Sequence, residues 1–184
     1  MSGESRWAGV VAVGALSGAA ASWVKSMAEP QLQRLGERLL PPDPEAKDEL
    51  GADIEDDETM PPAVLADRVA RRTRGSELSD DERSTAMESI HYAFGTAAGV
   101  AYAVAVTHDR RAAVGFGAAA GAGLFLATHA SSLPLIGIQG RPDQMPRAWW
   151  IWELGSHLVF GMTIEALRRV LTGSGAVLVA GVRS

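Results

Sequence analysis

Four long apolar runs constrain this sequence more than any other feature. They occupy residues 7–24, 91–106, 112–130 and 149–167. Each has close to the roughly 20 residues that a helix needs to cross a hydrocarbon core of about 30 Å. Charged residues are concentrated between positions 41 and 89, so the polar and apolar parts of the chain are segregated. The last run begins with Trp149, Trp150 and Trp152, which are typical of an interfacial aromatic belt.

The pattern predicts an all-α integral membrane protein, with residues 1–184 forming a single membrane domain built as a four-helix bundle. The predicted membrane helices are 7–24, 85–106, 112–130 and 149–167. One large polar loop, residues 30–80 and partly irregular, joins the first two helices. Two alternatives stay open: four buried helices of a soluble bundle, or a first run that is a signal peptide.

Two segments of the loop region carry helix signals. Residues 61–74, PPAVLADRVARRTR, begin with prolines and then show helical spacing of apolar side chains, which predicts a short amphipathic surface helix. Ser79 and Glu82 have the spacing of a capping box, which predicts the start of a helix that continues unbroken to Val106.

Composition excludes several classes of function. The net charge of −5 argues against a nucleic-acid partner, which favours a basic face. The chain has no cysteine, which removes disulfides, zinc–thiolate sites and thiol catalysis. No Walker loop, nucleophile elbow or zincin motif occurs, so the common hydrolase chemistries have no support. The lipid bilayer is the expected partner, together with a homo-oligomer or larger membrane complex.

Small residues recur at helical spacing in every apolar run. Helices in lipid pack through such residues because they let two backbones approach closely. The expected packing glycines are Gly14, Gly18, Gly95, Gly99, Gly117, Gly121 and Gly161.

The glycine rows lead into ionisable side chains on each helix, so the interior of the bundle is expected to collect them. These residues are Lys25, Glu29, Glu88, His91, His129, Glu153 and His157. With a rise of about 1.5 Å per residue, they fall in the half of the bilayer nearer the large loop. Ionisable groups inside a membrane are costly and are candidates for function. Glu165 lies toward the other side and is expected to pair with Arg168 or Arg169.

Three interpretations of this polar group remain open. It is a buried hydrogen-bond network that locks the helices together, a proton-responsive cluster, or a metal site. The candidate metal ligands are Glu88, His91, His129, Glu153 and His157. A full carboxylate-bridged site would need a Glu-x-x-His pair on each of two helices, and only the pair at 88–91 occurs.

Several motifs resemble those of the YagU-like bacterial inner-membrane proteins. They are GALSGAAASWVKSMAEP, IHYAFGTAAGVAY, THASSLPLIGI and WELGSHLVFGMTIEALRR. The likeness covers the four apolar runs but not the loop, which lacks the cysteines of some members. The resemblance implies an inner-membrane protein linked to survival under acid stress, and it carries no mechanism or catalytic residue with it.

Together with this resemblance, the sequence predicts a non-enzymatic inner-membrane protein of the acid-stress response that needs no cofactor. Its proton-responsive group would consist of His91, His129, His157 and Glu153, with Glu88, because histidine titrates near about pH 6.5. The alternatives are a metal-binding membrane protein or metal-dependent membrane enzyme, whose Glu and His residues hold a transition metal, and a structural subunit of a membrane complex.

Overall fold

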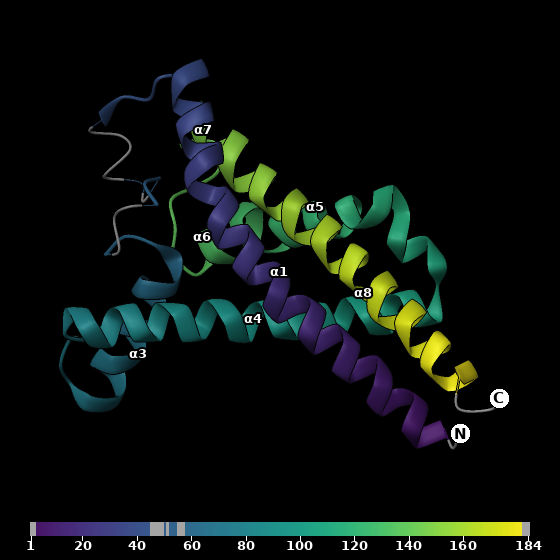
Figure 1. Ribbon diagram of the computed structural model, residues 1–184. Helices are drawn as coiled ribbons and strands as arrows, with labels where there is room; N and C mark the ends of the chain where they lie inside the picture. Colours follow the sequence, from purple (N-terminus) through teal and green to yellow (C-terminus); the bar gives the residue numbers. More distant parts are fainter. Residues whose placement is uncertain (1–2, 45–49, 51, 55–57, 182–184) are drawn as a thin grey trace. The chain divides into compact units, whose positions relative to one another are not determined.

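The computed structural model describes residues 3–44, 50, 52–54 and 58–181. Parts of the predicted polar loop, at 45–49, 51 and 55–57, lie outside the described residues. Within the described part the chain is helical and contains no strand, which confirms the predicted all-α fold (Figure 1). The α-helices are α1 (Gly3–Leu39), α3 (Pro61–Arg74), α4 (Asp80–His108), α5 (Ala118–Ala127), α6 (Leu133–Leu135), α7 (Arg147–Trp149) and α8 (Gly155–Gly181). Three non-α turns, η1 (Arg110–Gly117), η2 (Thr128–Ser132) and η3 (Trp150–Leu154), interrupt them.

Three helical stretches are long and apolar enough to span a membrane by length and composition. They are α1, α4 and the stretch Arg110–Leu135. The fourth predicted run, 149–167, is divided among α7, η3 and α8, and it is not among the spans found in the described residues.

Helix α1 continues to Leu39, well beyond the predicted end at residue 24. Residues 25–39 are rich in Lys, Glu, Gln, Arg, Met and Leu, which are good helix formers, and only Pro30 and Gly36 strongly oppose a continuous helix. The predicted end at residue 24 lies where hydropathy falls, but helix propensity does not fall there.

The third run starts its regular helix at Ala118 instead of residue 112, because a short irregular segment precedes it. Gly115 and Gly117 have φ values of 64° and 85°, and Phe116 between them has a φ of 56°. Glycine adopts this left-handed region without a steric penalty, whereas Phe116 is strained there. The two glycines therefore make the turn between α4 and α5.

The described chain forms two compact units. Unit 1 consists of Met1–Lys25, Tyr92–Ala122 and Leu158–Ser184, and unit 2 of Ser26–His91 and Gly123–His157.

Unit 1 is held together where glycines of different helices meet. Helices α1 and α4 cross so closely that a Cβ added to Gly99 would lie 2.6 Å from the Cα of Gly18 (Figure 1). A Cβ added to Gly161 of α8 would similarly lie 2.7 Å from the backbone nitrogen of Gly121. At both contacts the backbones approach to a distance that no larger side chain allows.

Unit 2 has a compact hydrophobic core to which four separate segments contribute. Its buried members are Ala52, Phe125, Met145, Trp149 and Trp152. Leu32 of α1 and Leu50, both within the predicted loop, pack against this core. Part of the predicted loop is therefore an integral part of unit 2.

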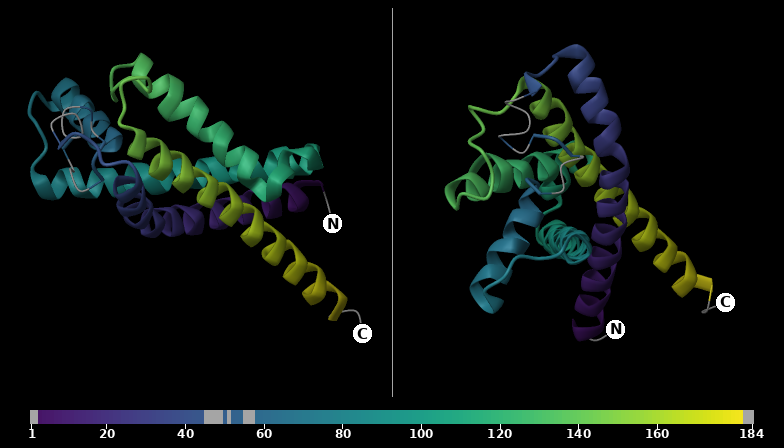
Figure 2. Two further views of the ribbon diagram at one scale, coloured as in Figure 1. Left: turned by 90° about the horizontal axis from the view of Figure 1, so that it is seen from above. Right: turned by 90° about the vertical axis from the view of Figure 1, so that its left-hand side faces the viewer.

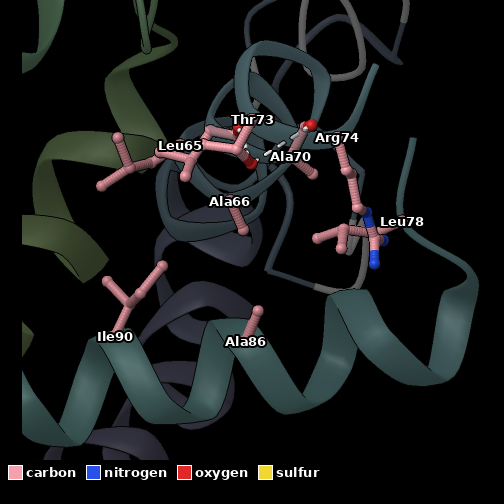
Figure 3. A pocket seen from close by; sticks show the side chains of 9 residues that line it. Leu65, Ala66, Ala70, Thr73, Arg74, Leu78, Ala86 and Ile90 are labelled. Carbon is pink, nitrogen blue, oxygen red and sulfur yellow. Dashed lines mark hydrogen bonds between the residues drawn. The ribbon is translucent and has the colours of Figure 1, made fainter. Parts of the chain in front are cut away.

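Helix α3 lies beside the first turns of α4, as Figures 1 and 2 show. The predicted amphipathic helix is thus confirmed, as is the capping box. The Ser79 backbone N–H donates to Glu82 Oε2 over 2.9 Å, and the Glu82 N–H donates to Ser79 Oγ over 3.4 Å. Between the two helices an open apolar groove is lined by side chains such as Leu65, Ala86 and Ile90 (Figure 3).

An ion pair clamps α3 to α4 at the end of this groove. Arg83 Nε donates to Asp67 Oδ2 over 3.0 Å, and the backbone N–H of Leu78 donates to Asp67 Oδ1 over 3.2 Å. Burial raises the pKa of Asp67, but the bonds from Arg83 and Leu78 and the charges of Arg83 and Arg71 outweigh it. The pKa of Asp67 therefore lies below its ordinary value.

A buried His–Glu–His cluster

Two π-helical turns bring three ionisable side chains together in unit 2. His129 lies in η2, Glu153 lies in η3, and His157 is in the first turn of α8. A π-turn inserts one extra residue into a helix and often occurs at functional sites. We call His129, Glu153 and His157 the His–Glu–His cluster.

The sequence around His129 explains its π-turn. Pro134 has no backbone N–H to donate to the preceding turn, and its ring clashes with the carbonyl four residues earlier. The hydroxyls of Ser131 and Ser132 instead donate to carbonyls five residues back, those of Leu126 (2.8 Å) and Ala127 (2.7 Å). These bonds support the wider turn that carries His129.

One carboxylate oxygen stands between the two imidazole rings. Glu153 Oε1 lies 3.4 Å from His129 Nε2 and 3.2 Å from His157 Nδ1. One ring nitrogen of each histidine and one carboxylate oxygen all lie within 4.8 Å of one another. Glu153 and His157 are buried, with 3% and 4% of their surface exposed, and His129 is partly buried.

Gln139 makes two contacts with His129 that bear on where the neutral ring carries its proton. The Gln139 side-chain Nε2 donates to the backbone carbonyl of His129 over 3.2 Å, so its Oε1 faces the ring. That oxygen lies 2.6 Å from His129 Nδ1. Because an amide oxygen only accepts, Nδ1 is the protonated nitrogen, and Nε2 directs its lone pair toward Glu153.

His157 is oriented in the same sense by its own helix. Its Nδ1 lies 2.8 Å from the backbone carbonyl of Glu153, which also only accepts. In the neutral ring the proton is therefore on Nδ1, and Nε2 keeps its lone pair. In both imidazoles Nδ1 thus makes a hydrogen bond to an acceptor outside the rings, an arrangement that metal-binding histidines commonly show.

Aromatic rings enclose the cluster. Phe125, which is 1% exposed, stacks near His129 with ring centroids 6.2 Å apart and meets His157 edge-on at 5.8 Å. Trp149, also 1% exposed, lies 6.5 Å from His129. Such walls exclude water, so charge in the cluster interacts more strongly than it would at a surface.

The three side chains fit a divalent transition metal. Ligand atoms about 2.1 Å from one metal lie roughly 3.0–3.4 Å apart in octahedral or tetrahedral geometry. The 3.4 Å distance between His129 Nε2 and Glu153 Oε1 agrees with this spacing, and one ligand atom of each of the three residues lies within 4.8 Å of the others. Two histidines and one carboxylate are a common ligand set for Zn²⁺ and for non-haem Fe²⁺.

The other predicted polar residues lie at different places. Glu29 is buried, and its Oε1 accepts a hydrogen bond of 3.3 Å from Ser156, which lies between Glu153 and His157 in the chain. Lys25 is buried in unit 1. His91 is partly buried and Glu88 is exposed, and neither belongs to the group of potential metal ligands found in the described residues.

A second buried carboxylate belongs to unit 1. Glu165 is fully buried and pairs with Arg168 (Nε to Oε2, 2.7 Å) and with Arg169, as its spacing predicted. Tyr102 Oη adds a hydrogen bond of 2.9 Å to Glu165 Oε2. Because these partners of Glu165 lie on its own helix, α8, or on α4, we interpret the group as a structural network.

Sequence reasoning missed Gln139. It lies after the third apolar run in an unremarkable polar stretch, and only its contacts reveal its role. The available signal was the short loop IQGRP, whose glycine and proline mark turns that bring Gln139 back toward His129.

Together, the three candidate spans and the buried ionisable cluster define a membrane-spanning helical protein of multi-pass type. A family model described as "Protein of unknown function (DUF1440)" matches residues 33–166. The chain belongs to this DUF1440 family. No curated protein and no solved structure matches the chain. The resemblance to YagU-like proteins therefore stays a prediction.

Proposed function

We propose that this protein binds a divalent transition-metal ion in its membrane domain, through the His–Glu–His cluster. One observation carries the proposal: in their neutral forms, both histidines commit Nδ1 to an outer acceptor while a shared carboxylate oxygen stands beside them. A lone pair on His129 Nε2 that faces a carboxylate oxygen at 3.4 Å is repulsive unless a proton or a metal ion lies between them. A bound metal ion supplies that charge.

The site's position also supports a role beyond helix packing. His129 lies in the candidate span Arg110–Leu135, where an ionisable group is costly. Fully apolar residues would pack a core more stably than a buried charge cluster does.

The proton-responsive function predicted from the sequence uses these three residues together with His91 and Glu88. Its link to acid stress comes from the resemblance alone, as does the bacterial inner membrane. We keep the inner membrane as the proposed location and one membrane domain as the proposed organisation, and the homo-oligomer or larger complex stays a prediction. The proposal for the cluster itself is metal binding.

Metal analysis of the purified protein tests the proposal. After chelation and dialysis in detergent, the parent should take up about one Zn²⁺ or Co²⁺ per chain. Co²⁺ should add visible absorption bands that report nitrogen and oxygen ligands. Replacing His129 and His157 by Gln should abolish both signals.

Two matched variants serve as controls. His91→Gln and Glu88→Gln remove the predicted ligand candidates that lie outside the cluster, and each should leave metal uptake unchanged. Equal uptake by the parent and the His129→Gln, His157→Gln variant would refute the proposal. Failure of the parent to bind any metal would also refute it and would favour the proton-responsive interpretation.

A further inference from the structure

A short loop after α6 holds Gln139 against His129 through two bonds to the same residue. The amide donates to the His129 carbonyl over 3.2 Å and accepts from His129 Nδ1 over 2.6 Å. The first bond fixes the orientation of the Gln139 amide, and this orientation places the amide oxygen as an acceptor at His129 Nδ1. Either bond alone would leave the amide free to rotate and the ring free to choose its tautomer.

The tautomer matters because Glu153 competes for the same proton. Glu153 Oε1 lies 3.4 Å from His129 Nε2 and, as an ionised carboxylate, only accepts. Without Gln139, a neutral His129 would be more stable with its proton on Nε2, where it can donate to Glu153. That tautomer occupies the ligand atom and closes the site to a metal.

Arg68 of α3 holds the loop that presents Gln139. Its two terminal guanidinium nitrogens donate to the carbonyls of Ile136 and Gly137, each over 2.6 Å. Gly137 has a φ of 66°, a turn that favours glycine. The Ile138 N–H donates to the Leu133 carbonyl over 3.0 Å and closes the turn.

The contacts of Arg68 and those of Gln139 form one continuous series from α3 to the cluster. Arg68 fixes the carbonyls at 136 and 137, these fix the backbone that carries Gln139, and Gln139 fixes His129. A planar fork suits two adjacent carbonyls, which a lysine cannot bind together in the same way.

We propose that Gln139 is a positioning residue that keeps His129 in the Nδ1–H tautomer, and that Arg68 supports it from α3. Gln139 thereby makes Nε2 of His129 available as a ligand atom. This inference rests on the proposed metal site for its purpose, but its structural content concerns the metal-free protein. Helix α3 lies outside the candidate spans, and through Arg68 it supports the conformation of the site.

The first test reads the tautomer directly in metal-free protein. Nitrogen-15 NMR of histidine-labelled protein in detergent distinguishes Nδ1–H from Nε2–H rings, and the His129→Gln variant assigns the signal. At about pH 8, above the ordinary histidine range, the parent should show Nδ1–H at His129. Gln139→Leu should convert it to Nε2–H.

Two variants separate positioning from simple damage to the fold. Gln139→Glu keeps an acceptor opposite Nδ1 and should retain the Nδ1–H signal. Gln144→Leu replaces an exposed glutamine of the same connection and should change nothing. Unchanged Nδ1–H in Gln139→Leu would overturn the inference, as would its loss in Gln139→Glu.

The second test measures metal affinity. Loss of an outer hydrogen-bond partner typically weakens metal binding by about 10–100-fold, and we expect this for Gln139→Leu, with recovery in Gln139→Glu. Arg68→Gln should weaken binding in the same direction, while Arg72→Gln, an exposed neighbour on α3, should not. Equal affinity in Arg68→Gln and Arg72→Gln would overturn the role of Arg68.

The tautomer measurement and the metal-affinity measurement test different statements. If no variant or parent binds metal, the proposed function falls, whereas the tautomer signals still decide the role of Gln139.

Discussion

Replacing Gly99 with alanine measures how closely α1 and α4 pack. The added methyl would lie 2.6 Å from the Cα and 2.7 Å from the nitrogen of Gly18. Comfortable contacts between such atoms are at about 3.5–4.0 Å, so the two helices must separate by roughly 1 Å. Overpacking of this size costs about 1–3 kcal/mol.

Helix propensity opposes this loss. Alanine is more stable than glycine within a helix by about 0.5–1 kcal/mol, so Gly99→Ala should destabilise unit 1 by about 1–2 kcal/mol net. Gly9 of α1 provides the matched control, because nothing lies within 4 Å of a Cβ added there. Gly9→Ala should keep the propensity gain and raise stability slightly.

Thermal unfolding in one detergent, followed by circular dichroism, compares the two variants. For a chain of this length, 1 kcal/mol corresponds to roughly 2–4 °C, so Gly99→Ala should lower Tm by about 2–8 °C. If Gly99→Ala unfolds at or above the temperature of Gly9→Ala, the close crossing of α1 and α4 is wrong.

Four further predictions concern other parts of the chain. The pKa of Asp67 is lowered from 3.8 in the folded protein, so the stability from its ion pair with Arg83 should be complete above about pH 4. That stability should be lost as the pH falls through the folded-state pKa of Asp67. A titration of stability against pH should show this step in the parent and not in Asp67→Asn. At neutral pH, loss of the Asp67–Arg83 bond should cost about 1–2 kcal/mol in chemical unfolding. Tyr102→Phe should cost about 1–2 kcal/mol in Tm-derived stability by removing the hydroxyl bond to Glu165, and an unchanged Tm would contradict that bond's importance. Reporters fused before α1 and after Asp43 should report opposite sides of the membrane, and a same-side result would remove α1 as a crossing.

Much of the helical architecture could be predicted because local signals determine it. The prolines at 61 and 62 begin α3, and Ser79 with Glu82 begins α4, as the capping chemistry requires. The apolar runs located the candidate spans, although the end of α1 was placed too early. Hydropathy locates the segment that can lie in the membrane, whereas the end of a helix depends on where the backbone preferences of the residues change.

The cluster could be predicted only in part. The spacing of Glu153 and His157 puts them on one helix face, and the row through Phe125 points His129 in the same direction. The π-turns and the return of Gln139 could not be read from periodicity, because they depend on tertiary hydrogen bonds. Seven ionisable residues were expected to converge, and three of them form the cluster.

The length of α1 has a consequence for how an ion reaches the protein. Its 37 residues extend about 55 Å, whereas the hydrocarbon core is about 30 Å thick, so an α1 that spans the membrane extends beyond the core. Leu32 in the continuing half lies against Gly155, where a Cβ would be 3.3 Å from it, between Glu153 and His157 in the chain. We therefore expect the cluster at the bilayer–water boundary. An ion would enter from one aqueous compartment and need not cross the lipid.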